Sequence, residues 1–332
     1  MIISRTPLRL SFAGGGSDLH AFYRHEPGAV FTTAIDKYIY ITVNKKFDHK
    51  IRASYSVTEI VDSVGDLQHE LIRAALTMVE LDGGIEITSI SDIPSQGTGL
   101  GSSSSYVVGL LNALYAYMGR HVGAERLARE ACEVEIARCG KPIGKQDQYI
   151  AAYGGWQYIQ FNPDDSVFVD PVICRPEVKR RLQDRLLLLY TGLTRSANDI
   201  LVEQRANTER HQDRRQAIQE MTRLAQDLRE LFCRNEIDLD AFGEILHEGW
   251  MMKRTLASGI STGRIDAWYE RARAHGAIGG KILGAGGGGF LLFYARPEQH
   301  RSIVAALPEL RPIPFRFEPQ GSKIVYVEEG AS

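Results

Sequence analysis

Residues 94–105 read Pro-Ser-Gln-Gly-Thr-Gly-Leu-Gly-Ser-Ser-Ser-Ser, and an apolar stretch with helical spacing follows at once. Glycine lets a backbone turn with its N–H groups pointing inward. The run of serines then opens a helix, whose N-terminus favours anions. The stretch therefore predicts a cradle for a triphosphate, with contacts from Pro94, Gly97, Gly99, Leu100, Gly101, Ser102, Ser103, Ser104 and Ser105.

Two other phosphate-binding loops do not match the sequence. The chain contains no GxxxxGK[ST], which excludes a Walker loop. Residues 284–289 spell GxGxxG, but residues 290–294, Phe-Leu-Leu-Phe-Tyr, read as a strand. A dinucleotide fingerprint needs a helix at that place, so this segment lacks the required context.

Composition indicates a protein that acts on small molecules. The 332 residues favour two domains, and the net charge of 39 − 41 = −2 offers no basic field for nucleic acid or an anionic membrane. The four cysteines lack CxxC or Cys/His spacing, so we expect reduced thiols in the cytoplasm. The first residues have no apolar core of a secretion signal, and no stretch approaches the roughly 18 apolar residues of a membrane span.

The spacing of apolar residues predicts an α+β fold. Residues 28–45 alternate and read as two strands joined near Asp36 and Lys37. The remaining predicted elements are helices over 67–81, 106–118, 124–137, 200–232, 240–257 and 298–306, and strands over 85–90, 186–190, 290–294 and 323–327, with a strand pair after Gly154. A charged stretch, 175–185, suggests a boundary that divides the chain into domains 1–182 and 183–332, the last strand belonging to the second.

Two acidic residues are candidates for binding a sugar or accepting a proton from its hydroxyl. Residues 7–18 place a strand with one arginine, Arg9, before a triple-glycine turn that ends in Asp18, which can bind sugar hydroxyls or merely cap the turn. Asp147 lies in a glycine-flanked segment after a helix, where its carboxylate can accept a hydroxyl proton. Phosphoryl transfer needs little more than such a base, a cation beside the transferred group and magnesium.

Magnesium prefers oxygen ligands and needs one or two protein groups beside the phosphates. Ser103 and Glu135 are the candidates for these ligands. Glu135 is equally compatible with a charge on a helix surface beside Glu130 and Glu133.

Taken together, the segments 6–18, 94–105 and 281–290 resemble in order the three motifs of the GHMP kinase family. The resemblance covers nearly the whole chain. It implies a two-domain fold, with an N-terminal domain that contains a left-handed βαβ crossover, a ferredoxin-like C-terminal domain and the active site between them. It also implies ATP as the phosphoryl donor.

The same resemblance implies roles for individual residues. Asp147 matches the catalytic aspartate, Arg9 the arginine near the transferred phosphoryl group, and Ser103 with Glu135 the magnesium ligands of sugar-kinase members. The substrate contacts that it implies come from the first motif, the Asp-Gln pair, the segment 190–195 and the third motif: Gly15, Gly16, Ser17, Asp18, Gln148, Arg195, Gly286, Gly287 and Gly288. The third-motif glycines are expected to approach the phosphates, although a structural tight turn is the alternative.

Within the family, Gly14 to Asp18 departs from galactokinases, which carry a glutamate and a histidine in that turn. The pattern looks closest to D-glycero-D-manno-heptose 7-phosphate kinases, which implies transfer to the anomeric hydroxyl. The resident 7-phosphate then needs a cationic partner, for which Arg195, Lys253 and Arg254 are available without a choice among them. A fucokinase-like enzyme acting on a free sugar and a non-catalytic sugar sensor are the alternatives. A homodimer is compatible with the sequence, which does not reveal the oligomeric state.

Overall fold

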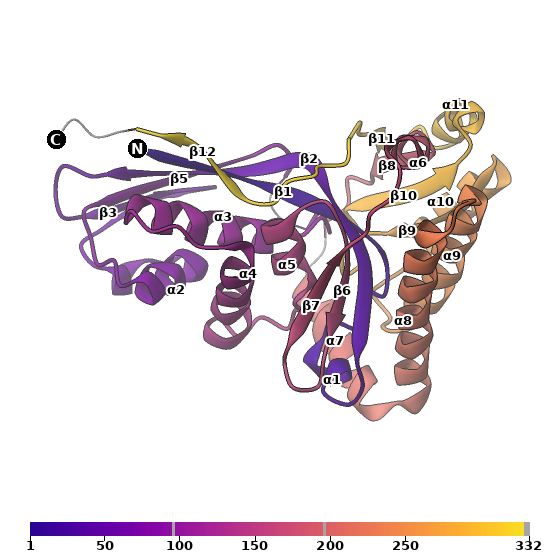
Figure 1. Ribbon diagram of the computed structural model, residues 1–332, viewed down its shortest axis with the longest axis horizontal. Coiled ribbons are helices and arrows are strands. Elements are labelled where there is room, and N and C mark those ends of the chain that lie inside the picture. Colours follow the sequence, from indigo (N-terminus) through magenta and orange to yellow (C-terminus); the bar gives the residue numbers. More distant parts are fainter. Residues whose placement is uncertain (95–96, 195–196, 329–332) are drawn as a thin grey trace.

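Two β-sheets organise the chain in this computed structural model, which describes residues 1–94, 97–194 and 197–328 (Figure 1). The first sheet has the order β12-β1-β2-β5-β3-β4, and β6 and β7 extend it from the other half of β2. Its strands are β1 (Ile2–Ala13), β2 (Gly28–Lys45), β3 (Ile51–Ser54), β4 (Thr58–Val61), β5 (Ile85–Ser91), β6 (Trp156–Phe161), β7 (Val167–Pro171) and β12 (Lys323–Val327). Strands β3 and β5 are parallel, and the chain between them passes through β4 and then α2 (Glu70–Val79), so that β3, α2 and β5 form a βαβ arrangement.

The second sheet has the order β11-β8-β10-β9, and each pairing in it is antiparallel. Its strands are β8 (Leu186–Tyr190), β9 (Ala277–Ile282), β10 (Phe290–Ala295) and β11 (Arg311–Pro312). In chain order the arrangement is fourth, first, third, second, which is the order of a ferredoxin-like sheet and confirms that prediction. The expected boundary between residues 182 and 183 stays a prediction, and the chain passes from α6 (Pro176–Gln183) to β8 at that point.

Helices cover both sheets and fill the space beside them. Figure 1 shows α2, α3 (Ser102–Tyr117), α4 (Ala124–Cys132) and α5 (Gln146–Tyr153) on one face of the first sheet, and α8 (Gln212–Cys233), α9 (Leu239–Lys253) and α10 (Gly263–Ala274) beside the second. The remaining helices are α1 (His20–Tyr23), α7 (Ala197–Arg210), α11 (Pro297–Ala306), the 3₁₀ turn η1 (Val64–Asp66) and the π-helix η2 (Glu133–Arg138). In the described residues, no helix is long and apolar enough to cross a membrane.

Aromatic side chains join the two halves of the molecule. Phe12 of β1 lies 5.1 Å from Phe242 of α9, measured between ring centroids. Phe232 of α8 stacks on Phe31 of β2 at 5.6 Å and meets Trp156 of β6 edge-on at 4.9 Å. Burial of these large apolar surfaces is strongly favourable. The aromatic contacts therefore hold β1, which begins the first motif, against the helices of the second half.

Four predicted elements differ from the structure. Residues 28–45 form a single strand, and the expected break is a bulge in which the register passes from Pro7↔Tyr38 to Leu8↔Ile35. Proline has no N–H for the ladder, so the strand opposite it can bulge without ending. The predicted helix over 200–232 is divided at His211, whose backbone is extended, because α7 contacts α1 whereas α8 packs on β2.

The last strand, which the sequence analysis placed in the second domain, lies in the first sheet. Strand β12 pairs antiparallel with β1, so the end of the described chain returns to the first sheet. The alternation of residues 323–327 predicts a strand but cannot identify its partner, which lies more than 300 positions away in the chain. The helix predicted over 124–137 also changes character, because α4 gives way to a π-helix, η2 (Glu133–Arg138).

Candidate active site

The triphosphate loop leads into the N-terminus of α3, as its sequence predicts. Gly101 precedes the helix in the left-handed region, at φ 76°, and Ser102 begins the first turn. Gly99 is also left-handed, and a methyl group there would lie 2.4 Å from the carbonyl oxygen of Leu283. One at Gly284 would lie 2.4 Å from the Cα of Gly99. The second and third motifs therefore pack backbone to backbone, which only glycine permits at these positions.

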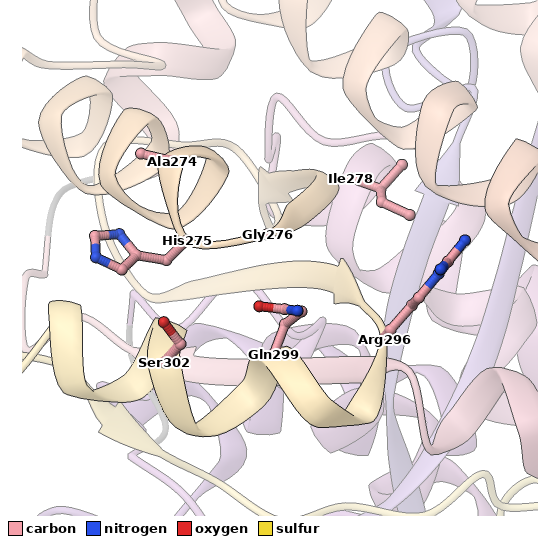
Figure 2. Close-up of a pocket in the computed structure, with 7 residues that line it drawn as sticks. All are labelled: Ala274, His275, Gly276, Ile278, Arg296, Gln299 and Ser302. Carbon is pink, nitrogen blue, oxygen red and sulfur yellow. The ribbon is translucent and has the colours of Figure 1, made fainter.

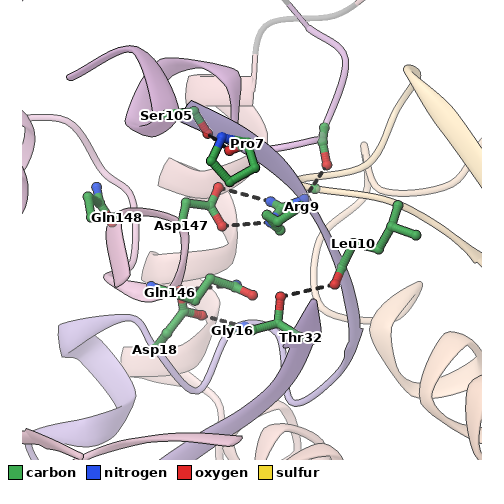
Figure 3. Close-up of polar contacts among 12 residues, drawn as sticks. Pro7, Arg9, Leu10, Gly16, Asp18, Thr32, Ser105, Gln146, Asp147 and Gln148 are labelled. Atoms are coloured by element: carbon green, nitrogen blue, oxygen red, sulfur yellow. Dashed lines mark hydrogen bonds and ion pairs between the residues drawn. The ribbon is translucent and has the colours of Figure 1, made fainter. Parts of the chain in front are cut away.

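The central ion pair joins Arg9 of β1 to Asp147 in the first turn of α5. Arg9 donates from Nε to Oδ1 at 2.8 Å and from Nη2 to Oδ2 at 2.9 Å, a bidentate arrangement (Figure 3). Its Nη1 donates to the carbonyl oxygen of Gly99 at 2.6 Å. The guanidinium is buried, whereas the Asp147 side chain keeps 23% of its surface exposed. Arg9 therefore fixes the catalytic carboxylate candidate beside the phosphate loop while that carboxylate still faces solvent.

Asp18 stands next to this pair and ties the first motif to the start of α5. Its carboxylate accepts hydrogen bonds from Gly16 N at 3.0 Å, from Gln146 N at 3.3 Å and from Gln146 Nε2 at 3.1 Å (Figure 3). Burial raises the pKa of Asp18, and the neighbouring Asp147 charge raises it further. Asp18 is thus a turn cap and also lines the cavity, while its binding of sugar hydroxyls stays a prediction.

Ser103 and Glu135 are brought together across two helices. Ser103 Oγ donates to Glu135 Oε1 at 2.5 Å, and Gln148 Nε2 donates to the other carboxylate oxygen at 2.5 Å. Glu135 lies in the π-helix η2 and is fully buried, so it is not a surface charge as the alternative proposed. Burial raises its pKa. π-Helical turns often occur at functional sites, and this one turns Glu135 inward beneath Ser103.

These elements enclose a cavity of about 530 Å³ between the three motifs. Thirteen predicted site residues line it: Arg9, Gly15, Gly16, Asp18, Gly97, Gly99, Gly101, Ser102, Ser103, Ser104, Asp147, Gly286 and Gly288. A cavity of this size suits a small ligand. The structure therefore brings the main parts of the sequence prediction to one place.

The other predicted residues that the structure describes lie outside the lining. Ser17 and Ser105 are buried and donate to backbone carbonyl oxygens, those of Gly14 and Ala29 for Ser17 and that of Pro7 for Ser105. Leu100 is a buried core residue, Pro94 is exposed, and Gly287 donates its N–H to the carbonyl oxygen of Ile260. Glu135 accepts hydrogen bonds from Ser103 and Gln148 and does not line the cavity. Arg195 lies outside the described residues.

The lining also contains polar residues that sequence reasoning did not assign. Lys281 belongs to the third motif, and its burial is visible only in the structure, where its ammonium donates to the carbonyl oxygen of Phe12. Gln204 is a buried glutamine of α7, and Gln146 supports Asp18. Ser11 Oγ is buried without a hydrogen-bond partner among the described atoms. The neighbouring Asp147 in the sequence is a signal that could have identified Gln146.

Comparison with known proteins identifies the family. The GHMP kinases N terminal domain matches residues 69–155, and the GHMP kinases C terminal domain matches residues 224–311. A D-glycero-alpha-D-manno-heptose 7-phosphate kinase of Campylobacter jejuni is 30% identical over 92% of this chain and 93% of its own length. An L-fucokinase/L-fucose-1-P guanylyltransferase of Bacteroides fragilis is 26% identical over 95% of this chain, which spans 37% of that larger protein.

A solved structure gives the same picture in three dimensions. It is that of a D-glycero-D-manno-heptose 1-phosphate kinase from Bacteroides thetaiotaomicron, with a TM-score of 0.81 and 26% sequence identity, covering 99% of this chain and 100% of the other. Both sheets and the site between the three motifs are included in that span. The chain belongs to the GHMP kinase family.

Proposed function

We propose that this chain is an ATP-dependent sugar kinase that phosphorylates the anomeric hydroxyl of D-glycero-D-manno-heptose 7-phosphate to the 1,7-bisphosphate, for nucleotide-activated heptose synthesis. The kinase class follows from its family, and the sugar class from relatives that match nearly its whole length. The observation that carries the mechanism is the bidentate pair of Arg9 and Asp147 in a cavity beside a glycine loop and Asp18.

Phosphoryl transfer at this site requires a base, a group that stabilises negative charge and a group that orients the sugar. Asp147 accepts the proton of the anomeric hydroxyl as its oxygen bonds to the γ-phosphorus and the bond to the ADP oxygen breaks. Arg9 holds Asp147 in place and stabilises negative charge on the transferred group. Asp18 has acceptor capacity left beyond its backbone and Gln146 bonds, so it can orient a second sugar hydroxyl.

Magnesium fits the donor set at the start of α3. Glu135 is a fully buried carboxylate that makes no ion pair among the described residues, and the exposed hydroxyl of Ser103 lies beside it. No cluster of three or more His, Cys, Asp or Glu side chains surrounds a metal position in the described residues, so the phosphates of ATP would complete the ligand set. When bound there, magnesium would neutralise charge on those phosphates.

Glu135→Gln tests the metal assignment. The substitution keeps the shape of the side chain but removes its charge, so we expect the Mg²⁺ concentration for half-maximal activity to rise about tenfold or more. The measurement is an initial-rate titration with Mg²⁺ at saturating ATP. Glu133→Gln is the matched control, because Glu133 lies in the same π-helix but is exposed and pairs with Arg138. An unchanged Mg²⁺ titration in a folded Glu135→Gln variant would remove Glu135 from the metal site.

The substrate is tested by ADP release from the purified protein with ATP and Mg²⁺. The panel contains D-glycero-D-manno-heptose 7-phosphate, the corresponding 1-phosphate, the free heptose, fucose, galactose and mannose. We expect turnover on the 7-phosphate to exceed that on each free sugar by at least about 100-fold, as for a site built around a charged group. The 1-phosphate is included because the structural relative is named for it.

The other outcomes separate the alternatives. Turnover on a free sugar alone would identify a fucokinase-like enzyme, and preference for the 1-phosphate would move the reacting hydroxyl away from the anomeric carbon. Sugar binding without turnover would favour a sensor. A cytoplasmic location and a homodimer belong to the same proposal.

A further inference from the structure

Two buried lysines of the second half line the cavity. Lys253 at the end of α9 and Lys281 in β9 are 7% and 4% exposed. The Lys281 ammonium donates to the carbonyl oxygen of Phe12 at 3.0 Å, and that of Lys253 donates to the carbonyl oxygens of Gly284 and, at 3.5 Å, Ile282. Neither lysine has a carboxylate within ion-pair distance in the part of the chain that the structure describes.

Burial of two such ammonium groups without a neighbouring anion is energetically unfavourable. Burial lowers the pKa of Lys253 to about 8, and it lowers that of Lys281 well below its ordinary value. The two charges also oppose each other, and Arg9 opposes both. The acids that line the cavity are already engaged, Asp147 by Arg9 and Asp18 by three hydrogen-bond donors.

The lining of the cavity carries a net positive charge. Four cations line the cavity, Arg9, Lys141, Lys253 and Lys281, against two acids, Asp18 and Asp147, which gives 4 − 2 = +2. Lys141 pairs with Glu70 outside the lining, which leaves 3 − 2 = +1, and Arg9 pairs with Asp147, so this excess resides on the two buried lysines. A phosphate anion would neutralise it.

A second cavity lacks such an excess. It has a volume of about 480 Å³ and lies between the end of α10 and α11, lined by His275, Gln299 and Ser302 among others (Figure 2). Arg296 also lines it but pairs with Asp240, so its charge is neutralised. That cavity therefore carries no comparable requirement for an anion.

We propose that Lys253 and Lys281 together form the subsite for the phosphate that the acceptor sugar already carries. The inference rests on the proposed function, because only a phosphorylated acceptor brings a second phosphate. The contact of Lys281 with Phe12 places it just before the glycine turn that leads to Asp18, on the acceptor side of the cavity. The proposal leaves the phosphates of ATP to the start of α3, which lines the same cavity.

Glutamine substitutions separate charge from structure. Lys253→Gln and Lys281→Gln keep an N–H donor for the carbonyl oxygens but remove the positive charge. We expect each variant to lower kcat/KM on the heptose 7-phosphate by about 10- to 100-fold, the value of a charge-assisted hydrogen bond. Activity on the free heptose and KM for ATP should change by less than about threefold, because neither involves the acceptor phosphate that the lysines would bind. Lys37→Gln is the control, because Lys37 is a half-buried lysine paired with Asp36 outside the cavity.

Each other outcome overturns the subsite. Equal losses on both acceptors, with a raised KM for ATP, would assign the lysines to the phosphates of ATP. Unchanged kinetics in both glutamine variants would mean that the two lysines only hydrogen-bond backbone carbonyl oxygens and do not bind the phosphate. If the glutamine variants do not fold, which thermal unfolding reports, Lys253→Arg and Lys281→Arg keep the charge, and they should then retain preference for the phosphorylated acceptor.

A binding measurement keeps this inference separate from the proposed function. With ATP replaced by AMP-PNP and Mg²⁺, calorimetry should detect binding of inorganic phosphate to the unmodified protein and at least tenfold weaker binding to the Lys253→Gln/Lys281→Gln double variant. If the 7-phosphate is not a substrate, the proposed function fails while this difference still supports the subsite. Absence of phosphate binding, or equal binding by both proteins, overturns the subsite.

The pH dependence gives a second signature. The Lys253 ammonium is charged below its pKa of about 8, so kcat/KM on the phosphorylated acceptor should decline as pH rises through that value. The charged groups that act on Lys253 are Arg9, Lys281, Asp18 and Asp147. Activity on the free heptose should lack this decline, and Lys253→Gln should remove it from the profile of the phosphorylated acceptor.

Discussion

Replacement of Asp147 by asparagine is expected to lower kcat by about 10²- to 10⁴-fold, because a positioned general base contributes that much to the rate. Asparagine cannot accept the proton of the attacking hydroxyl. It also turns an N–H₂ donor or a neutral oxygen toward Arg9, which now donates to both carboxylate oxygens. The KM for ATP should change little, since Asp147 is in the first turn of α5 and the phosphate loop leads into α3.

Loss of the ion pair must be distinguished from loss of the base. Asp240→Asn is the matched control, because Asp240 is partly buried and also binds arginines, Arg185 and Arg296, away from the cavity. We expect this control to lower the melting temperature without a large change in kcat. A kcat for folded Asp147→Asn within about tenfold of the unmodified value would remove the base assignment.

The motifs were readable from sequence because their chemistry is local. Gly97, Gly99 and Gly101 predicted a loop, and the serines after them predicted a helix start, since both depend on backbone preferences of neighbouring residues. Arg9 and Asp147 were candidates from their own segments, and the resemblance to a family implied their roles. Their contact spans 138 positions and follows only when β1 and α5 are placed together.

Features that depend on residues distant in the chain could not be predicted from the sequence. Lys281 is buried where its ammonium meets the carbonyl oxygen of Phe12, 269 positions away, and no spacing in its own segment signals a buried charge. The π-helix at Glu135 escaped because its residues also fit an α-helical pattern. Strand β12 was predicted, but its pairing with β1 was not, because alternation predicts a strand and not its sheet. Long-range packing decides each of these cases.

Arg9→Met should lower kcat by about 10³-fold, the scale on which an arginine stabilises the transition state of phosphoryl transfer. The substitution keeps a similar apolar stem but removes the donors to Asp147 and to the carbonyl oxygen of Gly99. Arg9→Lys restores a positive charge without the bidentate geometry, so we expect it to recover only a small part of the loss. Steady-state kinetics at saturating ATP measures both variants.

The double variant decides whether Arg9 and Asp147 act as one unit. Two independent groups would give losses that multiply, whereas groups that position each other lose little more when both are removed. Because both carboxylate oxygens of Asp147 are held by Arg9, we expect Arg9→Met/Asp147→Asn to be less than about tenfold slower than the slower single variant. Multiplicative losses would mean that Arg9 acts on the phosphoryl group independently of the carboxylate that it binds.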